Sequence, residues 1–252
     1  MDISSVTTNK VLFVTGASRG FGSLIVEKAL AKGHCVVATA RNHRALSERF
    51  GNHSNALCIA LDVTDEAQAH AASMAAAERF GRIDVLINNA GYCLLGAIEE
   101  ASSKEIEAIY RINVFGLLAV TRAVLPYMRR RRSGHIINFS SARHCVAHAG
   151  WGVYCSTKFA VEGLSEALAA ELETLGIRVT VVEPGDFCTA VRDTRSLAVS
   201  AHKIADYREP SGALRFAAVD MNCAQRGDPT KLADVLIELI HASNAPLDEG
   251  MT

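Results

Sequence analysis

The chain has 252 residues, of which 49% are hydrophobic and 21% are charged, a composition typical of a globular protein with a sizeable core. Its net charge of -1 excludes a global electrostatic attraction to nucleic acid or to an anionic membrane. The seven cysteines are scattered without a C-x-x-C pair, which favours reduced thiols over disulfides or a metal site. The N-terminus carries no apolar signal core, and no uncharged apolar run reaches membrane-spanning length, so we expect a cytoplasmic protein.

The first predicted strand, Lys10 to Val14, runs into a glycine-rich turn that opens a helical pattern. Gly16 permits a tight turn, while Gly20 and Gly22 let a ligand approach the helix N-terminus, whose free N–H groups attract phosphate. Outside this context the same glycines would indicate a plain turn. Between a strand and a helix they predict dinucleotide binding. The residues of this predicted phosphate cradle are Gly16, Ser18, Arg19, Gly20, Phe21 and Gly22.

The second predicted strand, Cys35 to Thr39, is followed by Arg41. An NAD-specific enzyme usually carries an acid near this strand end to bind the ribose 2′-hydroxyl, but no Asp or Glu occurs between Glu27 and Glu48. Arg41 and Arg19 would suit a 2′-phosphate, which guanidinium groups bind in bidentate fashion. The alternative is two solvated loop arginines. The missing acid favours NADP(H).

Tyr154 and Lys158 are four residues apart, so they lie one turn apart on one face of a predicted helix. A lysine ammonium beside a phenol stabilises the phenolate, so we expect the pKa of Tyr154 to lie below its usual value of ~10. Such a tyrosine can exchange a proton near neutral pH, as carbonyl reduction or alcohol oxidation requires. Ser141, after the predicted strand His135 to Phe139, is placed to hydrogen-bond the same substrate oxygen. Alone, Y-x-x-x-K is a weak signal, since this pair is usually an ordinary surface pair.

Five motifs in order resemble the short-chain dehydrogenase/reductase family over about residues 10 to 243. Among them, the turn reads T-G-x-x-x-G-x-G, the predicted strand Val85 to Asn88 runs into N-N-A-G, and Ser141 precedes Tyr154 by 13 residues and Lys158 by 17. Residues 184–189 resemble the family's P-G-x-x-x-T element.

The resemblance implies one domain over residues 1–252 with a doubly wound parallel sheet in the order 3-2-1-4-5-6 and helices on both faces. The third and sixth strands are predicted at Ala56 to Leu61 and Ile177 to Val182. A substrate lid is expected around residues 190–225. The tail after residue 243 has too few apolar residues to predict the seventh strand that relatives usually add.

The resemblance also assigns roles to single residues. Asn113 would be a fourth catalytic residue that holds a water between Lys158 and solvent; otherwise it is a core asparagine bonded to backbone. Asp62 and Val63 would hold the adenine, although Asp62 could instead cap the next helix. The further cofactor residues that the family implies are Asn89, Ala90, Gly91, Tyr154, Lys158, Pro184, Gly185 and Thr189.

The substrate pocket is less defined in the sequence. Arg143 and His144 lie in the loop between Ser141 and Tyr154, and a basic wall there favours a polar or anionic substrate unless these side chains point to solvent. Trp151 and Phe187 are candidate apolar walls or core residues. From the family we expect a homodimer or homotetramer, the dimer formed through the two long predicted helices, Lys104 to Arg131 and Gly152 to Thr174.

The function that these residues predict is NADP(H)-dependent hydride transfer between the nicotinamide and a carbonyl or secondary alcohol, most simply ketone or aldehyde reduction. Two alternatives stay open. One is a sensor that binds NADP(H) without turnover, and the other is an epimerase or dehydratase that uses the same fold. We expect a small-molecule substrate and no nucleic-acid, membrane or metal partner.

Overall fold

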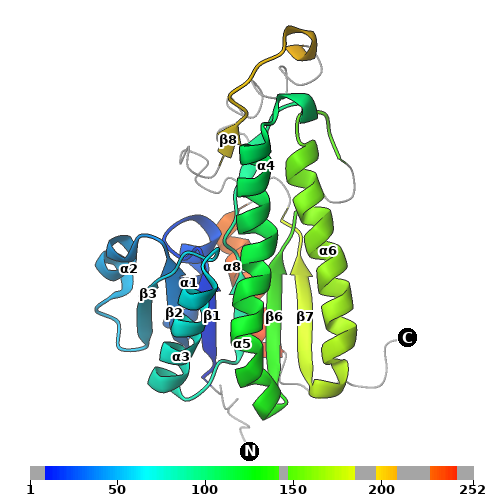
Figure 1. Ribbon diagram of the computed structural model, residues 1–252. Helices are drawn as coiled ribbons and strands as arrows, with labels where there is room; N and C mark the ends of the chain where they lie inside the picture. The colour runs from blue at the N-terminus through cyan, green and yellow to red at the C-terminus, as the bar shows by residue number, and fades with distance from the viewer. Residues whose placement is uncertain (1–8, 142–146, 185–196, 209–227, 243–252) are drawn as a thin grey trace, which may run out of the picture.

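The computed structural model describes residues 9–141, 147–184, 197–208 and 228–242. Six parallel strands form one sheet in the order β3-β2-β1-β4-β6-β7 (Figure 1). In chain order, β6 and β7 are the fifth and sixth strands of this sheet. The observed order therefore confirms the predicted order 3-2-1-4-5-6. The strands are β1 Val11–Thr15, β2 Cys35–Ala40, β3 Ala56–Ala60, β4 Val85–Asn88, β6 Gly134–Phe139 and β7 Ile177–Val182.

The central strands are mainly apolar because helices cover both faces of the sheet. Every residue of β1 and β4 is buried. The chain passes from β1 outward to β3 and then returns to β4 on the other side of β1. The strand order therefore reverses between β1 and β4, and open α/β sheets bind their ligands at the carboxyl ends of the strands at such a point.

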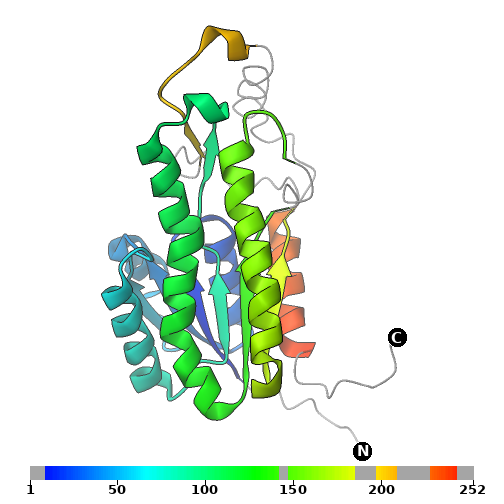
Figure 2. The same cartoon turned by 45° about the vertical axis from the view of Figure 1, so that its right-hand side comes forward.

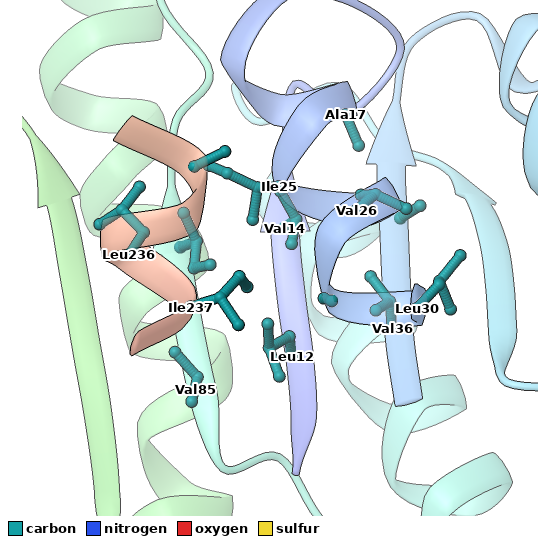
Figure 3. Packing of buried hydrophobic residues seen from close by; sticks show 14 of the residues in the cluster. Leu12, Val14, Ala17, Ile25, Val26, Leu30, Val36, Val85, Leu236 and Ile237 are labelled. Atoms are coloured by element: carbon teal, nitrogen blue, oxygen red, sulfur yellow. The ribbon is translucent and has the colours of Figure 1, made fainter. Parts of the chain in front are cut away.

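Helices α1 and α8 cover one face of the sheet, and α3, α5 and α6 cover the other (Figures 1 and 2). Figure 3 shows the first layer, where Ile25 of α1 and Leu236 and Ile237 of α8 pack over Leu12 and Val14 of β1. The α-helices are α1 Gly20–Ala31, α2 His43–Phe50, α3 Glu66–Phe80, α4 Ser103–Tyr110, α5 Leu117–Arg131, α6 Gly152–Leu172 and α8 Pro229–Ala242.

The predicted helix Lys104 to Arg131 is continuous from Ser103 to Arg131, with a π-helical stretch, η2 Arg111–Gly116, joining α4 to α5. Among the described residues it is the one helix long and apolar enough to cross a membrane, and 56% of its apolar window is buried inside the protein. Val120, Val124 and Met128 of α5 belong to the core between the helices and the sheet. This packing accounts for the apolar face of the helix.

A small second sheet lies beyond the carboxyl edge of the main one, where Figure 1 shows β8. Strand β5, Cys93–Leu95, pairs in parallel with β8, Leu197–Val199. Three acids then hold the segment after β8: Glu105 accepts from the Ala201 N–H, Glu100 from the Ile204 N–H, and Glu99 from the Tyr207 hydroxyl. Short 3₁₀ turns occur at η1 Ile98–Glu100, η4 Glu173–Leu175 and η5 Ala205–Tyr207. The rest of the predicted lid and the tail after residue 243 lie outside the described residues.

Candidate active site

The glycine turn has the geometry of a phosphate cradle. Gly16 and Gly20 have φ values of 68° and 54°, which favour glycine. A Cβ on Gly22 would lie 2.4 Å from the Gly16 oxygen, so only glycine lets α1 start this close to the turn. The N-cap Arg19 makes no side-chain cap bond, and the first turn of α1 holds no acid. The N–H groups at the N-terminus of α1 and the absence of negative charge in its first turn fit a dinucleotide phosphate.

Asn89, the residue directly after β4, holds this turn in place. Its amide nitrogen Nδ2 donates to the oxygens of Thr15 and Gly16 at 2.9 and 3.3 Å, and its N–H donates to Thr15 Oγ1 at 3.0 Å. Behind it, Asn88 Nδ2 donates to Asn138 of β6. The N-N-A-G tetrad therefore ties together the carboxyl ends of three central strands. Of the other predicted cradle residues, Ser18 is half-buried, and the ring of Phe21 packs 5.9 Å from that of Phe139.

The predicted adenosine end of the site lies beside the ends of β2 and β3. Arg41 is exposed directly after β2, where a ribose phosphate could meet it. Asp62 accepts from the N–H and the hydroxyl of Thr64. The N-cap of α3 is Asp65, so the alternative role of Asp62 as the cap of this helix is wrong. Val63 is buried against Gly116.

Ser141, Tyr154 and Lys158 form one buried cluster, with relative exposures of 9%, 8% and 8%. The Ser141 side chain hydrogen-bonds the phenol of Tyr154. One turn further along α6, Lys158 Nζ lies 5.8 Å from the Tyr154 ring centroid and donates to the Phe139 oxygen at 2.8 Å. The structure therefore brings together the three residues that the sequence separates by 17 positions.

Asn113, the fourth predicted residue, lies in the π-helical stretch and is 2% exposed. Its Nδ2 donates to the Tyr92 oxygen at 3.0 Å and to Thr157 Oγ1 at 3.2 Å, and its Oδ1 accepts from the Tyr92 N–H at 3.1 Å. Asn113 thus joins the segment after β4 to α6. Gly91 leaves room for it, since a Cβ there would lie 3.0 Å from Asn113 Oδ1. The water relay remains a prediction.

The expected low pKa of Tyr154 is wrong for this structure. Burial raises the pKa of Tyr154 well above its usual value, and the charge of Cys93 adds to this, while the Ser141 hydrogen bond lowers it. The ammonium of Lys158 is directed to a main-chain oxygen rather than to the phenol oxygen, and burial lowers its own pKa to about 8. Tyr154 is therefore held as a neutral phenol, which is the form that donates a proton.

Sequence reasoning missed Cys93. Its side chain hydrogen-bonds Tyr154, and its position two residues after the N-N-A-G tetrad was the available signal. Trp151 lies beside the cluster, with its ring 5.7 Å from that of Tyr154. Pro184 follows β7 at the carboxyl edge of the sheet. The predicted residues Arg143, His144, Gly185, Phe187 and Thr189 lie outside the described residues.

Comparison with known proteins identifies the family of this chain. Residues 10–199 match the pattern of the family described as short chain dehydrogenase. Oxidoreductase BOA17 of Botryotinia fuckeliana is 36% identical over 94% of this chain and 87% of its own, and 3-ketodihydrosphingosine reductase of Bacteroides thetaiotaomicron is 36% identical over 94% and 86%.

Solved structures give the same result. A short-chain dehydrogenase from Streptomyces avermitilis has a TM-score of 0.85 and 39% identity over 95% of this chain and 87% of its own. A short-chain dehydrogenase/reductase from Burkholderia phymatum in complex with NAD has a TM-score of 0.81 and 26% identity, and the match covers 93% of this chain and 86% of its own. A metagenomic short-chain oxidoreductase in complex with NADP has a TM-score of 0.73 and 27% identity, and the match covers 96% of each chain. With its glycine cradle and its buried serine, tyrosine and lysine, the chain belongs to the short-chain dehydrogenase/reductase family.

Proposed function

We propose that this protein is an NADP(H)-dependent reductase of ketones or aldehydes, able to run in reverse on secondary alcohols. The observation that carries the proposal is the buried phenol of Tyr154, hydrogen-bonded to Ser141 beside a glycine cradle suited to a dinucleotide. A neutral phenol with a raised pKa can protonate an oxygen on which negative charge develops. The relative named 3-ketodihydrosphingosine reductase supports the direction of reduction.

Each side chain has a role that follows from its contacts. When bound, the nicotinamide cofactor supplies the hydride to the carbonyl carbon. Tyr154 gives its proton to the substrate oxygen as the O–H bond of the phenol breaks. Ser141 donates a hydrogen bond to the same oxygen, and Lys158 supplies positive charge beneath the phenol. Asn113 holds the framework around them through Tyr92 and Thr157.

The preference for NADP(H) rests on charge at the end of β2. Arg41 is exposed there, Arg19 begins α1, and no acid stands between Glu27 and Glu48. A 2′-phosphate would gain charge-assisted hydrogen bonds from a guanidinium, whereas a 2′-hydroxyl would find no carboxylate partner in this stretch. The solved relative with NADP supports the proposal, and the relative with NAD marks the alternative.

The experiment is NADPH and NADH oxidation by the purified protein across a panel of ketones and aldehydes, with products identified. NADPH-dependent formation of an alcohol supports the proposal. Cofactor binding without turnover on any compound would favour a sensor. Product formed without net consumption of cofactor would favour an epimerase or dehydratase.

We also propose that the protein acts as a cytoplasmic homodimer or homotetramer, the dimer being formed through α5 and α6. Phe115 in η2 and Phe159 on α6 are 57% and 46% exposed, and large exposed apolar side chains on neighbouring helices are typical of an interface. Figures 1 and 2 both place these helices side by side. Sedimentation of the parent and of Phe159→Glu tests this, since the charge should produce monomers.

A further inference from the structure

Glu100 is a buried acid in the turn that follows β5. Its relative exposure is 0%, although a glutamate is almost never fully buried unless it is paired. Its Oε2 accepts a hydrogen bond from the Ala97 N–H at 2.8 Å, and its Oε1 accepts one from the Ile204 N–H at 3.0 Å. The first bond closes the turn, and the second reaches a segment 104 residues further along the chain. One side chain therefore joins two distant parts of the main chain.

Residues 197–208, which include β8 and η5, form a strap that three acids hold. Glu105 accepts from the Ala201 N–H at 2.9 Å. Glu99 accepts from the Tyr207 hydroxyl at 2.7 Å. Both of these hydrogen bonds are exposed to solvent, where water competes for them, whereas the third acid is fully buried. The buried acid therefore holds the strap most firmly.

The turn that carries this buried acid is also fixed against α6, the helix of the catalytic phenol. The Gly96 N–H donates to the Gly150 oxygen at 2.9 Å. Ile98 lies so close to Gly152, the first residue of α6, that a Cβ on this glycine would be 3.1 Å from Ile98 Cδ1. The turn and the start of α6 therefore keep one relative position, and whatever the turn holds is placed relative to the phenol as well.

The strap lies beside that phenol. Ala198 of β8 is in register with Leu94 of β5, and it packs against the apolar cluster that contains Leu94, Val153 and Tyr154. Figure 1 shows β8 beyond the carboxyl edge of the main sheet, the edge at which open α/β sheets bind their ligands. The strap is therefore placed to contact a carbonyl compound that reaches Tyr154.

We propose, building on the proposed reductase function, that Glu100 is a positioning residue for the substrate: its carboxylate holds the strap as one wall of the substrate site. The acid acts through the strap and not on the transferred proton. Both oxygens of a carboxylate accept hydrogen bonds, whereas the amide of a glutamine accepts through its oxygen and donates through its nitrogen. A glutamine at position 100 therefore cannot serve the N–H groups of both Ala97 and Ile204.

The first test is the kinetics of Glu100→Gln with NADPH and a ketone that the parent reduces. The strap loses its buried bond and occupies its binding position less often, so KM for the ketone should rise about threefold or more. Because Ser141 and Tyr154 keep their contacts, kcat should stay within about twofold and the Kd of NADPH should not change. Glu107→Gln, at an exposed position on α4, is the matched control and should leave KM as in the parent.

The second test needs no turnover, so it separates this proposal from the reductase function. Hydrogen exchange of the Ile204 N–H, followed by NMR, reports how often the bond to Glu100 opens. In Glu100→Gln this exchange should quicken by about 10- to 100-fold, because a hydrogen bond to a buried carboxylate is lost. Glu107→Gln should exchange at the parent rate.

Tyr207→Phe is a second variant that tests the strap without changing a buried group, since it removes only the exposed hydroxyl bond to Glu99. It should raise the exchange rate and KM in the same direction as Glu100→Gln, by smaller factors. An Ile204 exchange rate that stays at the parent value in Glu100→Gln would overturn the proposal. Faster exchange with an unchanged KM would also overturn it, because Glu100 would then have a structural role alone. Faster exchange in a protein that reduces no carbonyl would support the hold on the strap and count against the reductase.

Discussion

Lys158 Nζ donates a 2.8 Å hydrogen bond to the main-chain oxygen of Phe139, the last residue of β6. This contact fixes the first turns of α6 against the strand whose end carries Ser141. Because Tyr154 lies one turn before Lys158, the same contact sets the distance between the phenol and the serine hydroxyl. The lysine thus has a structural role in addition to supplying charge.

Asn113→Ala should impair catalysis through the framework. The change leaves the N–H and oxygen of Tyr92 without their partner and frees the segment that carries Cys93. We expect kcat/KM to fall about 10- to 100-fold and the free energy of unfolding to fall by about 1–3 kcal/mol. Steady-state kinetics and urea unfolding measure both. Asp65→Ala, which removes the α3 cap, should cost about 1 kcal/mol with little change in kcat/KM, so an equal kinetic loss there would contradict the interpretation.

Arg41→Asp should exchange the cofactor preference. The carboxylate repels a 2′-phosphate and can accept from a 2′-hydroxyl, so the ratio of kcat/KM for NADPH over NADH should drop by about 100-fold or more. The control Arg122→Asp removes an arginine that pairs with Glu66 on the outer helices. An unchanged ratio in Arg41→Asp would mean that the 2′-phosphate is bound elsewhere.

Gly22→Ala should destabilise the glycine turn, since its Cβ would lie 2.4 Å from the Gly16 oxygen and 2.6 Å from Asn89 Nδ2. Overpacking of this kind costs about 1–3 kcal/mol or more, and it should weaken NADPH binding as well. Gly163→Ala on α6 is the matched control, because a Cβ there meets nothing within 4 Å. That variant should be neutral or slightly more stable. Thermal unfolding with and without NADPH distinguishes the two.

Acid should unfold the protein through two buried histidines. Burial is the main cause that lowers the pKa values of His34 and His135 to about 4 each, while an unfolded histidine titrates near 6.5. Between these values the unfolded state binds more protons, so stability present at pH 7 is lost as the pH falls toward 4. The loss should be on the order of several kcal/mol.

Urea unfolding between pH 7 and pH 4.5 tests this. His135→Gln should flatten the pH dependence, and the exposed His70→Gln on α3 should leave it as in the parent. The same slope in all three proteins would show that these buried histidines do not cause the acid sensitivity.

Most of the sheet was predictable from the sequence because its strands are short, mainly apolar runs, and the central strands β1 and β4 are buried throughout. The limits of helix α3 also follow from local residues, since Asp65 caps its start and Gly81, with φ 76°, ends it. The same local chemistry located Tyr154, Lys158 and the glycine turn. These features depend on residues close together in the chain.

The features that the sequence did not reveal depend on distant contacts. Strands β5 and β8 have three residues each, and Cys93 finds its partner Leu197 only once the chain has folded. The helix α2 is short and largely polar, so it lacks a strong apolar period. The pKa of Tyr154 was predicted in the wrong direction because the spacing of two residues shows charge but not burial.

The central claim, that Tyr154 is the proton donor of a carbonyl reductase, is tested most directly by NADPH oxidation in the parent and in Tyr154→Phe at saturating cofactor. The phenylalanine keeps the ring and removes the hydroxyl. The account predicts turnover by the parent, a fall of about 10²–10⁴-fold in kcat/KM for the variant, and similar NADPH affinity in both. A variant that reduces the carbonyl as fast as the parent would contradict it.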